Sequence, residues 1–165
     1  MTMLMPQHAL SIRPIAEEET EAVLEVYRQC EDFLALGPVS TASLEMSRAQ
    51  AGVFCGIYAA DGKMVGIVDY VPKNWEGDPS VAFLSLLMIG APFRGQGIGA
   101  TVVEAVENEI RKDAGINAIA SGVQVNNPQA IEFWQRHGYR IVSGPIRMPD
   151  QTTVFHLRKD LISES

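Results

Sequence analysis

The chain has 165 residues, which suits a single domain with one hydrophobic core. Its hydrophobic fraction of 47% and charged fraction of 20% are typical of a globular protein, and no apolar run is long enough to predict a membrane span. The formal net charge of -7 argues against nucleic-acid binding, because phosphates are normally met by a basic face. The charge favours a cationic partner such as an amine, although solubility alone also explains it.

The N-terminal segment, residues 1–14, lacks the basic stretch, apolar run and cleavage site of a secretory signal. Cys30 and Cys55 are too few for a disulfide framework, and neither belongs to a metal-ligand pattern. We therefore expect a cytoplasmic protein that holds no metal.

The first predicted elements are a short strand over residues 9–13 and a helix over residues 16–30. Three glutamates, Glu17 to Glu19, occupy the first turn of this helix, where the positive end of the helix dipole stabilises their negative charge. Gly37-Pro38 then breaks the chain, and a second short helix is predicted over residues 41–50.

Three strands are predicted next, over residues 53–60, 64–71 and 82–89. Asp61-Gly62 is a hairpin-turn signal between the first two strands. The third strand is almost continuously apolar, which is typical of a central strand buried on both faces.

A helix is predicted over residues 97–114, with Gly115 as its stop, and a buried strand over residues 116–125. Asn127-Pro128 suits the N-cap and first position of another helix, which Gly138 can end in a left-handed conformation.

Two strands, 139–143 and 152–157, close the predicted order, joined by a loop that carries Pro145 and Pro149. This order predicts a single α/β (α+β) domain with a central mixed and mostly antiparallel sheet and helices on both faces.

The segment from Phe93 to Ala100 is rich in glycine and lies between a buried strand and a helix. Glycines let a backbone approach a ligand closely, and the free N–H groups of a helix start favour a phosphate. There is no Gly-Lys-Ser/Thr, so a Walker A loop is excluded. A dinucleotide fingerprint is formally matched by Gly95, Gly97 and Ala100, but the strand ends too early and the later strand lacks the acidic ribose ligand.

Two motifs together resemble the GCN5-related N-acetyltransferases over residues 10–161, leaving 1–9 as an N-terminal extension and 162–165 as a tail. Arg94, Gly97 and Gly99 match the pattern R/Q-x-x-G-x-G/A. About 30 residues later, the segment Asn127 to Tyr139 is similar to N-x-x-A-x-x-hydrophobic-Tyr/Trp-x-x-x-Gly-aromatic. The resemblance implies transfer of an acetyl group from acetyl-CoA to a primary amine, without a metal.

The resemblance also implies which residues hold the cofactor. Backbone groups of Leu87, Met88 and Ile89 would pair with the pantetheine arm, and the Met88 N–H would stabilise the oxyanion. Asn127 would both cap its helix and reach the pantetheine, while Trp134 would line the thioester end. The pyrophosphate would be held by the loop residues Arg94, Gly95, Gln96, Gly97, Ile98, Gly99 and Ala100.

The chain departs from the family pattern where protons must move. Many relatives carry a tyrosine acid where Trp134 stands, and an indole N–H cannot serve as a proton source. Some relatives carry a base carboxylate on the central strand, but Ser85 is the only polar side chain between residues 82 and 89. Asp69 and Tyr70, on the neighbouring strand, are the substitutes we consider for substrate binding, with Tyr70 also a catalytic candidate.

The acceptor amine stays open between a small molecule and a peptide. Alternatives are acetylation of protein N-termini or lysines, and a CoA-binding protein with little catalysis. Specificity is expected in the segments 33–50, 70–80 and 143–152, and a homodimer is an expectation from the family alone. His137 and His156 show no ligand-like spacing and are read as structural or exposed.

Overall fold

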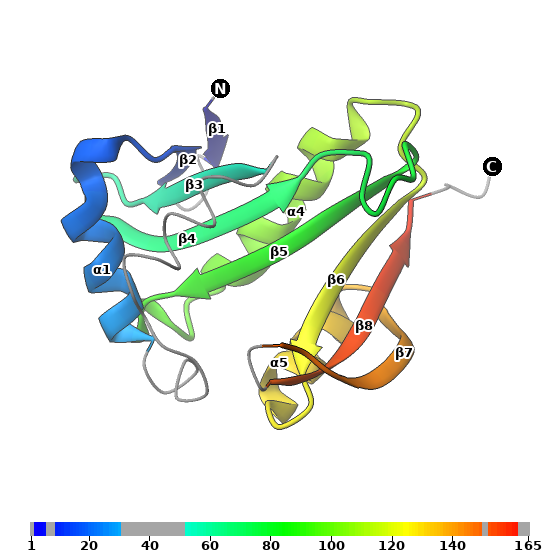
Figure 1. Ribbon diagram of the computed structural model, residues 1–165. Helices are drawn as coiled ribbons and strands as arrows, with labels where there is room; N and C mark the ends of the chain where they lie inside the picture. Colours follow the sequence, from blue (N-terminus) through cyan, green and yellow to red (C-terminus); the bar gives the residue numbers. More distant parts are fainter. Residues whose placement is uncertain (1, 6–8, 31–51, 150–151, 162–165) are drawn as a thin grey trace.

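The computed structural model describes residues 2–5, 9–30, 52–149 and 152–161 (Figure 1). The helix predicted over residues 41–50 and the tail 162–165 lie outside these ranges. The described strands are β1 (Met3–Met5), β2 (Leu10–Pro14), β3 (Val53–Tyr58), β4 (Met64–Val71), β5 (Val81–Ile89), β6 (Ala118–Gln124), β7 (Arg140–Arg147) and β8 (Thr153–Asp160). The helices are α1 (Thr20–Gln29), α4 (Ile98–Arg111) and α5 (Pro128–Arg136), with single 3-10 turns η2 (Glu17–Glu19) and η3 (Ala91–Phe93).

The eight strands form one sheet in the order β1-β2-β3-β4-β5-β6-β8-β7. Every neighbouring pair is antiparallel except β5 and β6, which run parallel. The predicted mixed, mostly antiparallel sheet is therefore confirmed. The single parallel pair is connected through α4, as a parallel crossover requires.

The two faces of the sheet are covered by different helices. Helix α1 buries Val23 and Val26 in a core with Ile67 of β4. Helix α4 lies behind the sheet in Figure 1 and buries Val102 and Val106 in a larger core on the opposite face. Each such side chain removed from water contributes about 1.5–3 kcal/mol, so both helices are held mainly by their apolar stripes. No helix of the described ranges is long and apolar enough to cross a membrane.

Strand β5 is buried on both faces only at its start. It pairs with β6 from Val81 to Leu84, opposite Ala118 to Ser121. Figure 1 shows the two strands side by side at one end and spreading apart toward the other. Beyond this pairing Ser85 is exposed, and Leu86, Leu87 and Ile89 are partly exposed. The prediction of a strand buried throughout was therefore wrong for its second half, because the apolar side chains there face a cleft.

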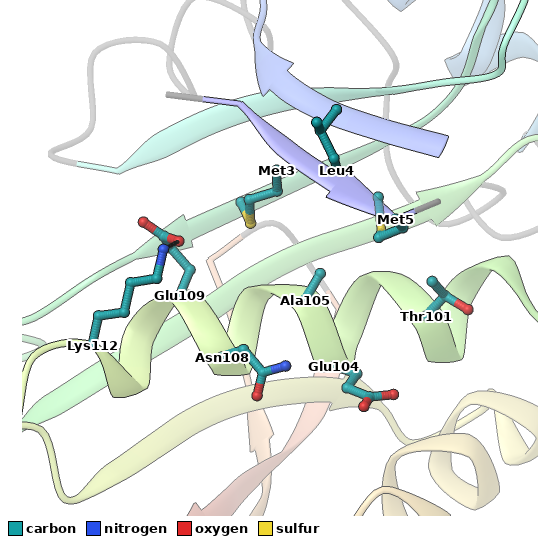
Figure 2. A pocket seen from close by; sticks show the side chains of 9 residues that line it. All are labelled: Met3, Leu4, Met5, Thr101, Glu104, Ala105, Asn108, Glu109 and Lys112. Atoms are coloured by element: carbon teal, nitrogen blue, oxygen red, sulfur yellow. Dashed lines mark hydrogen bonds and ion pairs between the residues drawn. The ribbon is translucent and has the colours of Figure 1, made fainter. Parts of the chain in front are cut away.

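The sheet has an edge strand that the sequence did not predict. Strand β1, within the segment predicted as an extension, pairs with β2 and buries Met3 and Met5. Leu4 between them is 72% exposed, the alternation expected of a strand with one covered face. A small groove of about 260 Å³ lies between β1 and α4. In Figure 2, Leu4 points away from the helix.

The opposite edge also differs from the prediction. Strand β7 continues to Arg147 and contains Pro145, which was predicted to lie in a loop. Proline has no N–H for a ladder bond and is tolerated on an edge strand. The pairing of β7 with β8 shifts register on either side of Ser143, so the ladder is interrupted close to the proline.

Local turn signals were confirmed at two of three glycines. Gly62 adopts φ 87° in the hairpin between β3 and β4, and Gly138 adopts φ 89° after α5. Helix α4, however, ends at Arg111, three residues before the predicted end, and Gly115 does not have a positive φ. The prediction that Gly115 ends this helix was therefore wrong.

Candidate active site

A cleft of about 810 Å³ opens where β5 and β6 diverge. Its walls are the second half of β5, the end of β6, the glycine loop with the start of α4, and one side of α5. Of the residues predicted to bind the cofactor, Gln96 alone is not part of the lining. Those that line the cleft are Leu87, Met88, Ile89, Arg94, Gly95, Gly97, Ile98, Gly99, Ala100, Asn127 and Trp134.

The glycine loop is shaped for a ligand that approaches the backbone. Gly95 and Gly97 adopt φ 78° and 77°, and a Cβ built on either would meet no atom within 4 Å. Gly97 is the N-cap of α4, and no side chain caps this helix start. The first N–H groups of the helix therefore face the cleft with the positive end of the helix dipole, an arrangement that binds anionic phosphates.

Arg94 has a structural role that the sequence did not reveal. Its Nε donates to the carbonyl oxygen of Ile89 at 2.9 Å, and its guanidinium also donates to the carbonyl oxygen of Gln29 at 3.5 Å. The Cys30 thiol donates to the same Ile89 oxygen at 3.4 Å. Arg94 thus joins the end of β5 to the end of α1 while adding positive charge to the cleft wall.

Asn127 combines the cap predicted for it with a place in the cleft. Its side-chain oxygen accepts from the N–H of Ala130 at 3.1 Å, and Pro128 follows at the first helical position. The side chain is thus fixed at the start of α5, where the same residue lines the cleft.

Trp134 is held in place by a buried polar cluster behind it. The indole is 7% exposed and packs edge-on against Phe133 and Tyr139. The Tyr139 hydroxyl donates to Glu107 at 2.8 Å, and Lys159 forms an ion pair with the same carboxylate at 2.9 Å. Burial and the neighbouring Glu107 raise the pKa of Tyr139, so its hydroxyl stays protonated. This cluster fixes the α5 wall of the cleft.

Several cleft residues were missed by the sequence analysis. The hydroxyl of Ser121 donates to the carbonyl oxygen of Leu84 at 2.8 Å, at the last pair of the β5–β6 ladder. His137, predicted to be structural or exposed, lines the cleft with its ring on Phe133, and Arg136 lies beside it. Burial lowers the pKa of His137, outweighing the opposite effect of Glu107. The cationic Arg136 and Arg94 offset the acidity of the chain at this site.

Asp69 and Tyr70 point to opposite faces of the sheet. Tyr70 is 1% exposed in the core on the α4 side, and burial raises the pKa of its hydroxyl. Nothing in the lining of the cleft supports a site role for it. Asp69 is 3% exposed on the α1 side, and Ser85, which does line the cleft, donates to its backbone oxygen at 2.9 Å. Of the two candidates, the structure connects Asp69 to the cleft.

The described part of the chain contains no group of three His, Cys, Asp or Glu side chains that could hold a metal ion. Cys30 and Cys55 are both buried thiols. The polar groups that line the cleft are backbone amides, amide and hydroxyl side chains, His137 and two arginines, which suit an anionic organic cofactor.

Solved structures with this fold are numerous. The chain superposes on an acetyltransferase of Thermus thermophilus with a TM-score of 0.75 at 19% identity, covering 93% of this chain and 97% of that one. It superposes on the PaiA N-acetyltransferase of Thermoplasma acidophilum in complex with coenzyme A with a TM-score of 0.65 at 18% identity, covering 92% and 99%. At these identities the likeness establishes the fold.

Two curated proteins match part of the sequence. The probable N-acetyltransferase san of Drosophila melanogaster is 40% identical over 93 residues, which cover 56% of this chain and 50% of that protein. The N-alpha-acetyltransferase 50 of Danio rerio is 38% identical over 52 residues, which cover 32% and 31%. The chain thus spans half or less of the length of the curated relatives it matches.

A family model described as the acetyltransferase (GNAT) family matches residues 12–139. This range contains both sequence motifs, the glycine loop and the two diverging strands. The match covers well over half of the chain, and it agrees with the fold and with the curated relatives. The chain therefore belongs to the acetyltransferase (GNAT) family.

Proposed function

We propose that the protein transfers the acetyl group of acetyl-CoA to a primary amine. The observation that carries this proposal is the cleft between β5 and β6, which ends at a helix start with two open, left-handed glycines, Gly95 and Gly97. A pyrophosphate bound at that helix start would place an extended arm along the free edge of β5. Membership of the GNAT family makes acetyl-CoA the cofactor that this shape fits.

The strand edges on either side of the cleft offer backbone groups to the pantetheine arm. Among the described residues, β5 and β6 stop pairing after Leu84 and Ser121, which leaves backbone groups free along the cleft. An arm that carries amides can therefore bind there as a strand would. The Ile89 oxygen already accepts from Arg94 and Cys30. Met88 lies opposite Ile67 in a pair whose backbone groups face β4, because the Gly90 N–H donates to Val65 in the same ladder. Leu87 is therefore the residue of β5 that we assign to the arm.

The reaction is a direct acyl transfer. The amine nitrogen attacks the thioester carbon, the new C–N bond forms, and the C–S bond breaks to leave a thiolate. We assign a backbone N–H on the cleft side of β5 to the oxyanion that develops between these steps. Trp134 closes the site against water, but its indole cannot supply the proton that the thiolate takes up. That proton comes from the attacking nitrogen.

For the acceptor we favour the α-amine of a peptide over a small molecule. The support is that the curated relatives at about 40% identity include a protein named as an N-alpha-acetyltransferase. An α-amine with a pKa of about 8 is also deprotonated more readily than an alkyl amine with a pKa of about 10.

The test is a calorimetric titration of the full chain with acetyl-CoA, followed by thiol release with a panel of peptides and small amines. Binding and turnover of a peptide with a free N-terminus support both parts of the proposal. Turnover of small amines alone keeps the acetyltransferase and overturns the peptide acceptor. Binding without turnover of any amine favours the CoA-binding alternative, and absence of binding overturns the cofactor assignment.

A further inference from the structure

Asp69 is a buried carboxylate without its full set of partners. It lies on β4 between Phe54 of β3 and Leu86 of β5, on the sheet face that α1 covers. Among the described residues its Oδ1 has no hydrogen-bond partner, and solvent does not reach that atom. A Cβ built on Gly52 would lie 2.9 Å from Oδ1, so the close approach of Gly52 leaves no room for a side chain there.

Ser85 connects this carboxylate to the cleft. It is the extra residue of a β-bulge, because Asp69 pairs with Leu86 while Tyr70 pairs with Leu84. Its hydroxyl donates to the Asp69 backbone oxygen at 2.9 Å, and Ser85 also lowers the pKa of the Asp69 carboxyl group. Ser85 itself is exposed in the cleft. The bulge thus places one hydroxyl in the cleft and against the backbone of the residue that carries the buried acid.

The surroundings of Asp69 keep it able to take up a proton near neutral pH. Burial raises its pKa to about 6, although Ser85 and the Tyr70 N–H pull in the opposite direction. Burial and Asp69 raise the pKa of the neighbouring Cys55 thiol to about 12, so this thiol stays neutral. On the face of the sheet where Asp69 lies, the other buried ionisable groups among the described residues are Tyr27 of α1, Cys30 directly after α1, and Tyr58 of β3. Tyr70 points to the opposite face.

The other buried carboxylate of the described chain makes the contrast clear. Glu107 is 4% exposed, but it has an ion pair with Lys159 and a hydrogen bond from Tyr139. Glu107 is thus satisfied by its neighbours, as buried charges usually are. The Oδ1 atom of Asp69 has no such partner among the described residues, and a buried acid with an unsatisfied atom near a cleft is a candidate for a functional group.

We infer that Asp69 accepts, through the Ser85 hydroxyl, the proton that the acceptor ammonium must lose before it attacks acetyl-CoA. This inference rests on the proposed acetyltransferase function. The ammonium gives a proton to Ser85 Oγ while the Ser85 hydroxyl gives its own to the Asp69 carboxylate. The freed amine then forms the C–N bond, the C–S bond breaks, and a second proton from the nitrogen neutralises the thiolate. Asp69 returns its proton to solvent after the product leaves.

The kinetic test measures kcat/KM against pH with a peptide of free N-terminus. If Asp69 accepts the proton, kcat/KM of the wild type should be constant from about pH 6 up to the amine pKa of about 8. Asp69→Asn should lose about 10²-fold at pH 7, and its rate should rise about tenfold per pH unit up to pH 8, because only free amine then reacts. Ser85→Ala should behave in the same way, and Ser85→Thr should restore the plateau. A uniform loss at every pH in Asp69→Asn overturns the inference.

Glu107→Gln is the matched control, a buried carboxylate removed outside the relay. It should leave the shape of the pH profile unchanged, so that a change of shape belongs to Asp69. A second measurement needs no turnover: infrared or NMR titration of the Asp69 carboxyl group in the full chain. The inference expects a pKa near 6 that rises further in Ser85→Ala. A wild type that acetylates no amine overturns the proposed function, whereas a carboxyl that titrates at the ordinary value of about 4 overturns this inference.

Discussion

At the scale of single residues, the site depends on backbone conformations that only glycine adopts at low cost. Gly97 caps α4 at φ 77° and faces open space in the cleft. Gly62 has a similar positive φ of 87°, also with open space around it, in a hairpin that does not line the cleft. Substitutions at both positions impose backbone strain, but only a side chain at position 97 would also exclude a ligand from the cleft. Comparing them distinguishes the two effects.

Gly97→Val is expected to weaken acetyl-CoA binding by at least about 10²-fold, because a branched side chain would occupy the space in which we place the pyrophosphate. Gly62→Val should impose a similar backbone strain of about 1–2 kcal/mol without changing the affinity. Calorimetric titration of both variants, together with their melting temperatures, makes the comparison. Equal affinity in both variants would remove the glycine loop from the cofactor site.

The unsatisfied Asp69 also predicts how stability depends on pH. Its pKa of about 6 in the folded protein exceeds the ordinary value of 3.8, so folding favours the protonated form. Its contribution to stability is therefore full below about pH 4 and is lost as the pH rises through 6. Asp69→Asn should be more stable than the wild type by about 3 kcal/mol at pH 8, with little difference at pH 4.

Urea unfolding of Asp69→Asn and the wild type at the two pH values measures this effect. A variant that is less stable than the wild type at pH 8 would mean that the carboxylate is satisfied in the folded protein. In that case the Asp69 carboxylate would stabilise the fold through hydrogen bonds and would not serve as the proton acceptor.

At the scale of elements, the cleft exists because two neighbouring strands stop pairing. Strands β5 and β6 share four pairs, and the Ser121 hydroxyl then takes the last carbonyl, that of Leu84. The bulge at Ser85 on the other side of β5 interrupts the pairing with β4 at the same level. The end of the β5–β6 ladder and the bulge thus coincide, and both expose β5 to the cleft.

The polar cluster behind Trp134 ties α4, α5 and β8 together. Glu107 of α4 receives the hydroxyl of Tyr139, which follows α5, and the ammonium of Lys159 in β8. Glu107→Ala should lower the free energy of unfolding by about 3 kcal/mol, because it leaves a half-buried ammonium and a buried hydroxyl unpaired. Denaturant unfolding measures the loss. Lys112→Ala, which removes an exposed ion pair with Glu109, is the control and should change stability by less than about 1 kcal/mol.

At the scale of the whole molecule, a bound cofactor should join the two halves of the sheet. The glycine loop and β5 form one wall of the cleft, and β6 and α5 form the other. Acetyl-CoA at 100 times its dissociation constant should stabilise the folded protein by about 2.7 kcal/mol, seen as a raised melting temperature. The rise should be absent in Gly97→Val and preserved in Gly62→Val. If acetyl-CoA does not change the melting temperature of the wild type, the proposed cofactor is contradicted.

Features that depend on neighbouring residues could be predicted from the amino-acid sequence. The hairpin at Asp61-Gly62, the cap at Asn127 and the glycine loop all follow from the torsions and hydrogen bonds of a few consecutive residues. The order of elements then predicted the sheet class, because hydrophobic periodicity reports which face of each element is buried. These local signals were enough to predict the sheet class, and the resemblance to the GNAT family implied eleven of the residues that line the cleft.

Features that depend on residues far apart in the chain emerged only from the folded arrangement. The placing of Ser85 at a bulge requires the register between β4 and β5, and the missing partner of Asp69 requires knowing everything packed around it. The added edge strand β1 and the proline inside β7 likewise depend on which strand lies at the edge. Such facts arise from long-range pairing and packing, whose energy is not contained in any short stretch of sequence.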